Sequence, residues 1–342
     1  MKLLITGGAG FIGSALIRYL IHHTEHSVIN IDKLTYAGNL ANLASVSGSQ
    51  RYLFYQTDIT EQTVLSKILD KHQPDAIIHL AAESHVDRSI DTAEHFIHSN
   101  IIGTYALLEA IHHYWQTLPE KQQQNFRFLH VSTDEVYGDL GKSEDCFHEN
   151  SPYAPNSPYS ASKAASDHLV RAWHKTHQLP TIITHSSNNY GHFQYPEKLI
   201  PKTIISALNG KPIEIYGTGE QIRDWLYVDE HIRALYCVLQ NGRIGENYLI
   251  GGQNPQTNIA IVQQICTYLE ELAPNKPAHI QHYRDLITHI TDRKGHDMRY
   301  ALDSSKIQQL GWCVQTTFTE SLKNTVQWYI TNKIWWQNIQ AA

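Results

Sequence analysis

A run of glycines between an apolar segment and a helical pattern constrains this chain more than any other feature. Residues 2–6 form a short apolar run typical of a buried strand, and residues 11–23 have the apolar spacing of a helix. Between them, Gly7, Gly10 and Gly13 give the pattern G-x-x-G-x-x-G. Such glycines allow a tight turn, and they let a pyrophosphate approach the free N–H groups at the start of the helix. The pattern predicts a strand, a turn and a helix that bind a dinucleotide.

An acidic residue at the end of the next predicted strand indicates which dinucleotide. Asp32 lies 19 residues after Gly13. A carboxylate there accepts hydrogen bonds from the ribose hydroxyls of adenosine, and it repels a 2′-phosphate. We therefore predict NAD rather than NADP as the cofactor. Asp58 and Ile59, after the third predicted strand, are expected to contact the adenine edge.

Apolar runs and helical patterns alternate through the first half of the chain. Six strands alternating with helices predict an α/β fold with a doubly wound parallel sheet. The predicted strands are 2–6, 28–32, 52–55, 76–80, 126–132 and 181–184, and the predicted helices are 11–23, 61–72, one long helix ending near 115, and 158–177.

The second half has a different pattern. Helices are predicted at 196–209 and 229–241, with two or three more after residue 257. A chain of 342 residues is long for one layer of helices on a small sheet. We predict a Rossmann domain of residues 1–185, to which 222–250 returns. Residues 186–221 and 251–342 are expected to form a smaller mixed α/β domain that binds the substrate.

Composition excludes several classes of function. The formal net charge is −6, whereas nucleic-acid and anionic-membrane binders need a basic field. We therefore expect neither nucleic acid nor membrane as a partner. The four cysteines contain no C-x-x-C pair, which favours a reducing cytoplasm over a disulfide framework. The 22 histidines are scattered without ligand spacing, so no metal is predicted.

A tyrosine and a lysine have the spacing of a proton-transfer pair. Tyr159 and Lys163 form Y-x-x-x-K, and residues at i and i+4 share one face of a helix. A free phenol has a pKa near about 10, but a neighbouring ammonium and a cofactor cation both favour the phenolate. Lys163 can also reach a ribose hydroxyl. Tyr159 is therefore predicted to remove a hydroxyl proton while hydride leaves the same carbon.

Two adjacent acids follow the fifth predicted strand. Thr133, Asp134 and Glu135 lie where substrates bind in open α/β sheets, beyond the carboxyl ends of the strands. Alcohol oxidation needs only Thr133, Tyr159 and Lys163. Paired carboxylates in different environments can divide into a protonated acid and an ionised base. Elimination of water needs both, so the acid pair predicts a dehydration next to a ketone.

Taken together, these stretches resemble a known family. The chain is similar to the extended short-chain dehydrogenase/reductase superfamily, and within it to the dTDP-glucose 4,6-dehydratases. The run from Thr133 to Glu135 is the most specific part, since the related epimerases lack the acid pair. The matching stretches are 6–13, 32–40, 81–89, 133–138, 158–163, 187–191, 196–201, 221–228 and 295–297 with Arg299 and Tyr300.

The resemblance implies a homodimer formed through helices near 95–115 and 158–177, and a role in nucleotide-sugar metabolism that leads to dTDP-rhamnose and cell-surface polysaccharide. It also implies residue roles. Catalysis is assigned to Thr133, Asp134, Glu135, Tyr159 and Lys163. The NAD contacts are Gly7, Gly10, Phe11, Ile12, Gly13, Asp32, Lys33, Thr35, Asp58, Ile59, Leu80, Ala81, Ala82, Ser84, Ser99, Tyr159, Lys163 and Asn189. The substrate contacts are Ser84, Thr133, Asn188, Lys198, Leu199, Arg223, Asn258, Arg293, His296 and Tyr300.

Alternatives stay open at this point. His192, Lys294 and Met298 depart from the family pattern on the nucleotide side, so UDP-, CDP- or GDP-hexoses remain alternatives to dTDP-glucose. A 4-epimerase or another NAD-dependent sugar-nucleotide dehydratase would share most of the motifs. A non-catalytic NAD-binding sensor would share the fold, but it would be expected to lose Tyr159, Lys163 or the acids.

Overall fold

A seven-stranded sheet organises the molecule, for which a computed structural model describes residues 1–341. All its strands are parallel and follow the order β10-β6-β5-β4-β1-β2-β3. The predicted doubly wound Rossmann sheet is confirmed, with a seventh strand added. The strands are β1 (Lys2–Thr6), β2 (Ser27–Asp32), β3 (Tyr52–Gln56), β4 (Ala76–His79), β5 (Arg127–Thr133), β6 (Thr181–Ser186) and β10 (Asn247–Ile250).

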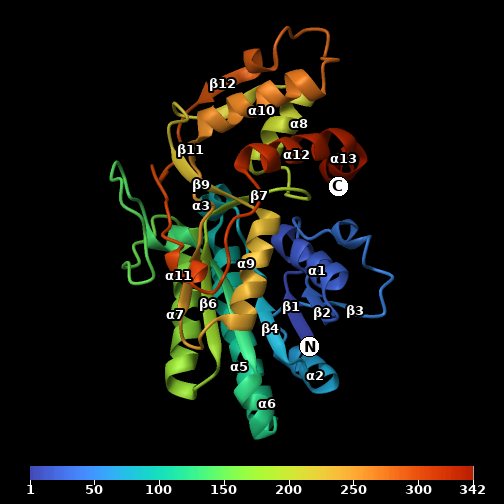
Figure 1. The fold of residues 1–342 in the computed structure, drawn as a ribbon, viewed down its shortest axis with the longest axis vertical. Helices are drawn as coiled ribbons and strands as arrows, with labels where there is room; N and C mark the ends of the chain where they lie inside the picture. The colour runs from blue at the N-terminus through green and yellow to red at the C-terminus, as the bar shows by residue number, and fades with distance from the viewer. Residues whose placement is uncertain (342) are drawn as a thin grey trace.

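Helices cover both faces of this sheet (Figure 1). One face packs on α1 (Phe11–His23) and α9 (Val228–Asn241) through a core that includes Leu16, Ile17 and Leu235. The other face packs on three helices through a second core: α2 (Gln62–His72), α5 (Gly103–Thr117) and α7 (Pro158–His177). Because both faces are covered, the strands other than β3 are buried almost throughout, including polar residues such as His130 and His185. The short helix α11 (Ser305–Gln308) adds Ile307 to the first core, whereas α6 (Glu120–Asn125) contributes no buried residue.

A smaller part of the chain caps the sheet at its upper end in Figure 1. It contains a three-stranded sheet, β11-β9-β7, and a two-stranded sheet, β12-β8. Trp336 is buried in its core, so the tail beyond Thr331 packs onto the rest of its own chain. Its elements are β7 (Asn188–Tyr190), α8 (Leu199–Leu208), β8 (Ile213–Tyr216), β9 (Ile222–Tyr227), β11 (Pro255–Thr257), α10 (Asn258–Leu272), β12 (Ile287–Ile290), α12 (Phe318–Thr331) and α13 (Lys333–Ala341).

Two predicted helices differ from the structure. The long helix ending near residue 115 is broken into α3 (Val86–Asp91), α4 (Ala93–Phe96), a π-helical turn (Ile97–Ile102) and α5. A π turn accommodates an extra residue, and such turns are frequent at functional sites. The helix predicted from 196 begins only at Leu199, because the backbone of Lys198 is extended. As a result, Ser99 of the π turn and Lys198 both line one cavity of the molecule.

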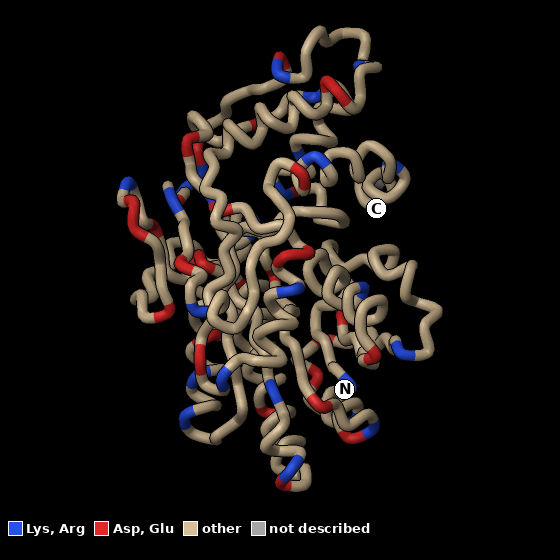
Figure 2. The backbone as a smooth tube through the Cα atoms, viewed as in Figure 1, with Lys and Arg blue, Asp and Glu red and all other residues tan. Residues whose placement is uncertain are grey.

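Charged side chains of both signs are distributed over the whole molecule. Lys and Arg alternate with Asp and Glu over both parts of the chain (Figure 2). The four cysteines are free thiols. Within residues 1–341, no helix combines the length and apolar character needed to cross a bilayer.

Candidate active site

A cavity of about 300 Å³ lies between the sheet and the smaller part of the chain. It opens where the strand order reverses, between β1 and β4, which is the usual ligand site of doubly wound sheets. All eighteen predicted NAD contacts line it, as do all five predicted catalytic residues. The structure therefore gathers side chains from Gly7 to Lys198 around one space.

The glycine turn packs too closely against neighbouring backbone to admit a side chain at two of its positions. Gly7 has a φ of +73°, and a Cβ there would come within 2.6 Å of the Ala81 backbone nitrogen. A Cβ on Gly13 would lie 2.2 Å from the Gly7 carbonyl oxygen. Side chains are thus excluded at both positions. The first turn of α1 has no side-chain cap, so its N–H groups are free to bind a pyrophosphate.

Asp32 supports the turn as well as facing the cavity. One carboxylate oxygen accepts the N–H of Ala9 at 2.9 Å, and the other accepts the N–H of Leu34 at 2.8 Å. Burial raises the pKa of Asp32, and these backbone hydrogen bonds oppose that shift. Each carboxylate oxygen has a second lone pair for ribose hydroxyls. The residues present therefore fit the pyrophosphate and adenosine ribose of NAD.

The broken helix completes the adenosine end of the cavity. The π turn carries Ser99, whose hydroxyl accepts a hydrogen bond from the Lys33 ammonium at 2.8 Å. The Lys33 ammonium also lies 3.3 Å from a carboxylate oxygen of Asp58. Three of the predicted contacts are thus linked to one another. Asn100, the next residue of the turn, binds Glu83 of the β4 loop and Ser162 of α7.

At the opposite end of the cavity, the two acids have different protonation preferences. Asp134 is 1% exposed, and burial together with the charges of Glu135 and Asp224 holds its pKa well above the usual range. One of its oxygens contacts the Thr133 hydroxyl at 3.3 Å. The other oxygen has no hydrogen-bond partner within the part of the chain that the structure describes. The surroundings of Asp134 therefore favour its protonated form, and its second carboxyl oxygen can bind a ligand.

Glu135 is surrounded by cations. Burial raises its pKa, while Arg293, Arg223 and Lys198 oppose the shift. This carboxyl is thus held closer to ionisation than that of Asp134. The predicted division of the pair into an acid and a base agrees with these environments.

Tyr159 and Lys163 point from the first turns of α7 toward the same space. Burial and the charge of Glu135 raise the pKa of Tyr159, whereas its hydrogen bond with Thr133 lowers it. The chain alone therefore holds a neutral phenol, and the predicted lowering by the Lys163 ammonium does not dominate. Burial lowers the pKa of Lys163 to about 8, and Asp167 opposes that shift.

The predicted substrate contacts fall into two groups. Ser84, Thr133, Asn188 and Lys198 line the cavity, and the Lys198 ammonium donates to the Ser84 carbonyl oxygen at 2.8 Å. The other six lie outside the lining, farther into the smaller part. They are Leu199, Arg223, Asn258, Arg293, His296 and Tyr300.

Arg223 is more constrained than a free phosphate-binding cation. Its guanidinium donates to the carbonyl oxygens of Ile222 and Asp297, both at 2.8 Å, and it stacks 4.4 Å from the centre of the Tyr300 ring. These contacts fix the cation near the acid pair, whose pKa values it lowers.

Sequence reasoning missed several residues of the site. Glu197 lies in one of the matching stretches without an assigned role, yet it lines the cavity and accepts a hydrogen bond from Tyr36 at 3.0 Å. Asp167, four residues after Lys163, forms a buried cluster with His130 and His185. The i+4 spacing from Lys163 was the available signal for Asp167. No signal along the chain pairs it with histidines from two strands.

Comparison with known proteins decides the family. The family model described as GDP-mannose 4,6 dehydratase matches residues 4–325. The dTDP-glucose 4,6-dehydratase of Haemophilus influenzae is 60% identical, with 97% of this chain and 98% of that protein covered. The one from Neisseria meningitidis is 58% identical, with 99% and 96% covered. The chain belongs to the dTDP-glucose 4,6-dehydratase family.

Solved structures agree with this assignment. The Streptomyces venezuelae dTDP-glucose 4,6-dehydratase, solved with NAD and TYD bound, superposes with a TM-score of 0.90 at 42% identity, covering 99% of this chain and 100% of that chain. A UDP-glucuronic acid 4-epimerase from Bacillus cereus has a TM-score of 0.83 at 28% identity, with 97% and 99% covered. The expected activity, NAD-dependent nucleotide-sugar 4,6-dehydration by a hydro-lyase, is confirmed for the family. The epimerase alternative is the more distant one.

Proposed function

We propose that this enzyme converts dTDP-glucose to dTDP-4-keto-6-deoxyglucose and water. The observation that carries the proposal is the acid pair at the cavity. Asp134 is held as a neutral acid, and Glu135 is surrounded by three cations. Oxidation or epimerisation at C4 needs neither group, whereas removal of water across C5 and C6 needs one proton acceptor and one proton donor. The names of the relatives support dTDP-glucose as the hexose nucleotide.

The first step is oxidation at C4 of the sugar. When bound, NAD would supply a hydride acceptor for C4 and then a hydride donor for C6, and its oxidised form would add a positive charge to the site. Tyr159 accepts the proton of the C4 hydroxyl at its phenol oxygen. Lys163 holds a ribose hydroxyl and favours the phenolate. Thr133 donates a hydrogen bond to the oxygen that becomes the ketone.

The second step is elimination. The C4 ketone acidifies the neighbouring C5 proton, which the Glu135 carboxylate removes. The Asp134 carboxyl donates its proton to the departing C6 hydroxyl, and water leaves. The sugar is reduced at C6 and reprotonated at C5. Glu135, protonated in the elimination, is the nearby donor for that last proton.

Substrate contacts are assigned to residues on both parts of the chain. Ser84 and Asn188 are proposed to bind the sugar and phosphate region. Lys198 is proposed to bind the diphosphate, and Arg223 to hold charge beside it. Leu199, Asn258, Arg293, His296 and Tyr300 are assigned to the nucleotide side. Asp292 orients the His296 ring through a 2.6 Å contact.

Product masses from a panel of nucleotide hexoses test this function. The purified enzyme is incubated with dTDP-, UDP-, CDP- and GDP-glucose and GDP-mannose without added NAD. We expect loss of one water from dTDP-glucose, because the cofactor is regenerated in each turnover. A product of unchanged mass would instead establish an epimerase. Reaction with another nucleotide alone would correct the assigned base.

We also propose a cytoplasmic homodimer formed through α5, α7 and the π turn. Ile97, Ile102 and Tyr105 support it, because they are 50%, 46% and 42% exposed on one stretch of that region. Apolar side chains gathered on a surface indicate an interface. Sedimentation of the enzyme and of the double variant Ile97→Asp, Ile102→Asp checks this. We expect a dimer that the variant converts to monomers, and a monomeric parent enzyme would refute it.

A further inference from the structure

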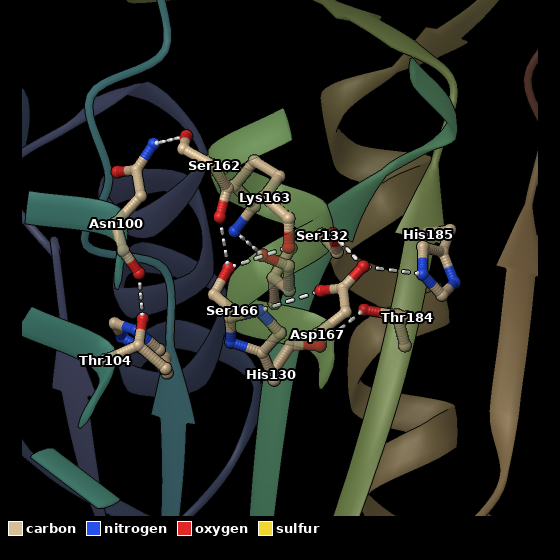
Figure 3. A network of polar contacts seen from close by, with 12 residues as sticks. Asn100, Thr104, His130, Ser132, Ser162, Lys163, Ser166, Asp167, Thr184 and His185 are labelled. Atoms are coloured by element: carbon tan, nitrogen blue, oxygen red, sulfur yellow. Dashed lines mark hydrogen bonds and ion pairs between the residues drawn. The ribbon is translucent and has the colours of Figure 1, made fainter. Parts of the chain in front are cut away.

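A buried ionic cluster lies one helical turn along α7 from Lys163. Its centre is Asp167, four residues after Lys163 on α7 and 1% exposed. Figure 3 shows Asp167 between His130 of β5 and His185 of β6, with Lys163 from the same helix beside them. Both rings lie 3.1 Å from the carboxylate, and both are fully buried. Nothing in the reaction proposed above uses this cluster.

Three groups hydrogen-bond to one oxygen of the carboxylate: the Ser132 hydroxyl at 2.9 Å, the Tyr153 hydroxyl at 3.1 Å and the His185 Nε2 at 3.1 Å. The His130 Nε2 lies 3.1 Å from the other oxygen without forming a hydrogen bond. Against the effect of burial, the histidine contacts lower the pKa of Asp167 far below its usual range. The surroundings therefore favour the ionised form of the carboxylate.

The groups around the cluster add little opposing charge. Burial and Lys163 lower the pKa of His130 to about 4, and burial holds the pKa of His79 well below its usual value. Neither ring is a cation at neutral pH. His185 also contacts Tyr137, whose pKa burial raises. The remaining charged groups lie farther out, with Arg171 near Tyr153 and Glu149 near Tyr137.

Lys163 needs such a partner. Its ammonium is buried, and its one protein hydrogen bond in the described chain goes to the neutral Val131 carbonyl oxygen at 2.9 Å. A buried ammonium loses its proton readily unless an anion lies nearby. The acid pair does not supply that anion: Asp134 is neutral, and the charge that raises the pKa of Lys163 is that of Asp167 rather than that of Glu135. Asp167 is the carboxylate placed to do so, one helical turn away.

We propose that Asp167, held by His130 and His185, is a positioning residue that keeps the Lys163 ammonium charged inside the dry active site. Because the pKa of His130 is lowered to about 4, this ring adds no opposing charge beside the carboxylate at neutral pH. The proposal rests on the role assigned to Lys163 above. It adds Asp167 of α7, His130 of β5 and His185 of β6 to the residues that support the active site.

The direct test is a pH titration of Lys163 by NMR in enzyme labelled with carbon-13 at the lysine ε position. The Lys163 signal is the one absent from Lys163→Met. We expect a pKa near 8 in the parent enzyme. In Asp167→Asn the Lys163 pKa should be lower by at least about one pH unit, which is the usual effect of one nearby charge. The control Ser166→Ala alters a buried neighbour that bonds only to helix carbonyl oxygens, and it should leave the titration unchanged.

An unchanged Lys163 titration in Asp167→Asn would overturn the proposal. It would mean that the cluster only stabilises the fold. If Asp167→Asn does not fold, Asp167→Ser tests the same point with the same two outcomes. The pH profile of kcat provides the second readout, and its basic limb should move down with the Lys163 pKa. Full turnover by Lys163→Met would instead refute the assigned role of Lys163, and the NMR result would still report on the charge coupling.

Discussion

Two aspartates near the tyrosine–lysine pair are equally buried, and their surroundings favour opposite protonation states. Asp134 and Asp167 are each 1% exposed. The pKa of Asp134 lies well above the usual range, and that of Asp167 lies far below it. Asp134 has carboxylates as neighbours and one weak hydroxyl contact, whereas Asp167 has three hydrogen-bond partners and a fourth contact with His130.

The difference shows that burial alone does not set the protonation of a carboxyl. Burial penalises the charged form of both, and the surrounding groups decide the outcome. One site keeps a proton available for a leaving hydroxyl. The other keeps a charge available for an ammonium. The following variants test that contrast, beginning with the largest expected effect.

Removing the acid function of Asp134 should have the largest effect. We expect Asp134→Asn, and equally Glu135→Gln, to lower kcat for water loss by about 10²–10⁴-fold, the usual contribution of a proton-transfer group. Product formation is followed by mass. The matched control is Asp303→Asn, which alters an exposed carboxylate that caps Ser305. Undiminished dehydration by both Asp134→Asn and Glu135→Gln would show that the assigned roles are wrong.

Removing the charge of Asp167 should destabilise the fold. Loss of one member of a buried hydrogen-bonded ionic group costs about 3–5 kcal/mol. The folded pKa is depressed, so this stability is present above the unfolded value of 3.8 and is lost as the pH falls further. Urea midpoints of the parent and Asp167→Asn should therefore differ equally from pH 8 to pH 5 and converge only in stronger acid. Equal midpoints at pH 8 would contradict the ionised state of Asp167.

The same substitution at Asp134 should increase the free energy of unfolding at pH 8, whereas at Asp167 it should decrease it. A raised folded pKa gives stability that is present below the unfolded value and is lost as the pH rises. Asp134→Asn avoids that loss, so urea unfolding should show it to be more stable than the parent at pH 8. A tenfold difference in the acid constant between folded and unfolded enzyme corresponds to about 1.4 kcal/mol. The difference in the free energy of unfolding between Asp134→Asn and the parent should shrink as the pH falls. A less stable variant at pH 8 would mean that Asp134 is ionised in the folded enzyme.

The smallest effect is expected from one donor of the Asp167 cluster. Tyr153→Phe removes a hydroxyl that donates at 3.1 Å and leaves the hydrogen bonds with Ser132 and His185 and the contact with His130. We expect a loss of about 1 kcal/mol, the usual value of one hydrogen bond, measured by urea unfolding at pH 8. The pKa of Lys163 should not change, because the Asp167 carboxylate remains ionised. A loss as large as that of Asp167→Asn would mean that Tyr153, rather than the histidines, holds the charge.

The contrast also shows what a sequence can predict about such a site. The glycine turn, Asp32 and the pair Tyr159 and Lys163 each have a local spacing that fixes their placement, and all of them meet in one cavity. The role of each residue in that cavity is still a prediction. Asp134 and Glu135 were predicted from their adjacency after a strand.

The features that the sequence did not predict depend on contacts between residues that are far apart along the chain. The broken helix before Gly103 depends on contacts of Ser99 and Asn100 with distant residues. The partners of Asp167 come from two different strands, so scattered histidines in the sequence gave no sign of them. The small sheets of the substrate side join strands such as β8 and β12, which are far apart along the chain. The proposed domain boundaries remain a prediction for the same reason.

The central claim is that Asp134 donates the proton that lets water leave. The most direct measurement mixes Asp134→Asn with dTDP-glucose and follows the near-ultraviolet absorbance of reduced nicotinamide in a single turnover. The account predicts that C4 oxidation proceeds, so the absorbance rises and persists while the sugar keeps its oxygen at C6. An absorbance that decays at the parental rate, with loss of water from the sugar, would contradict it.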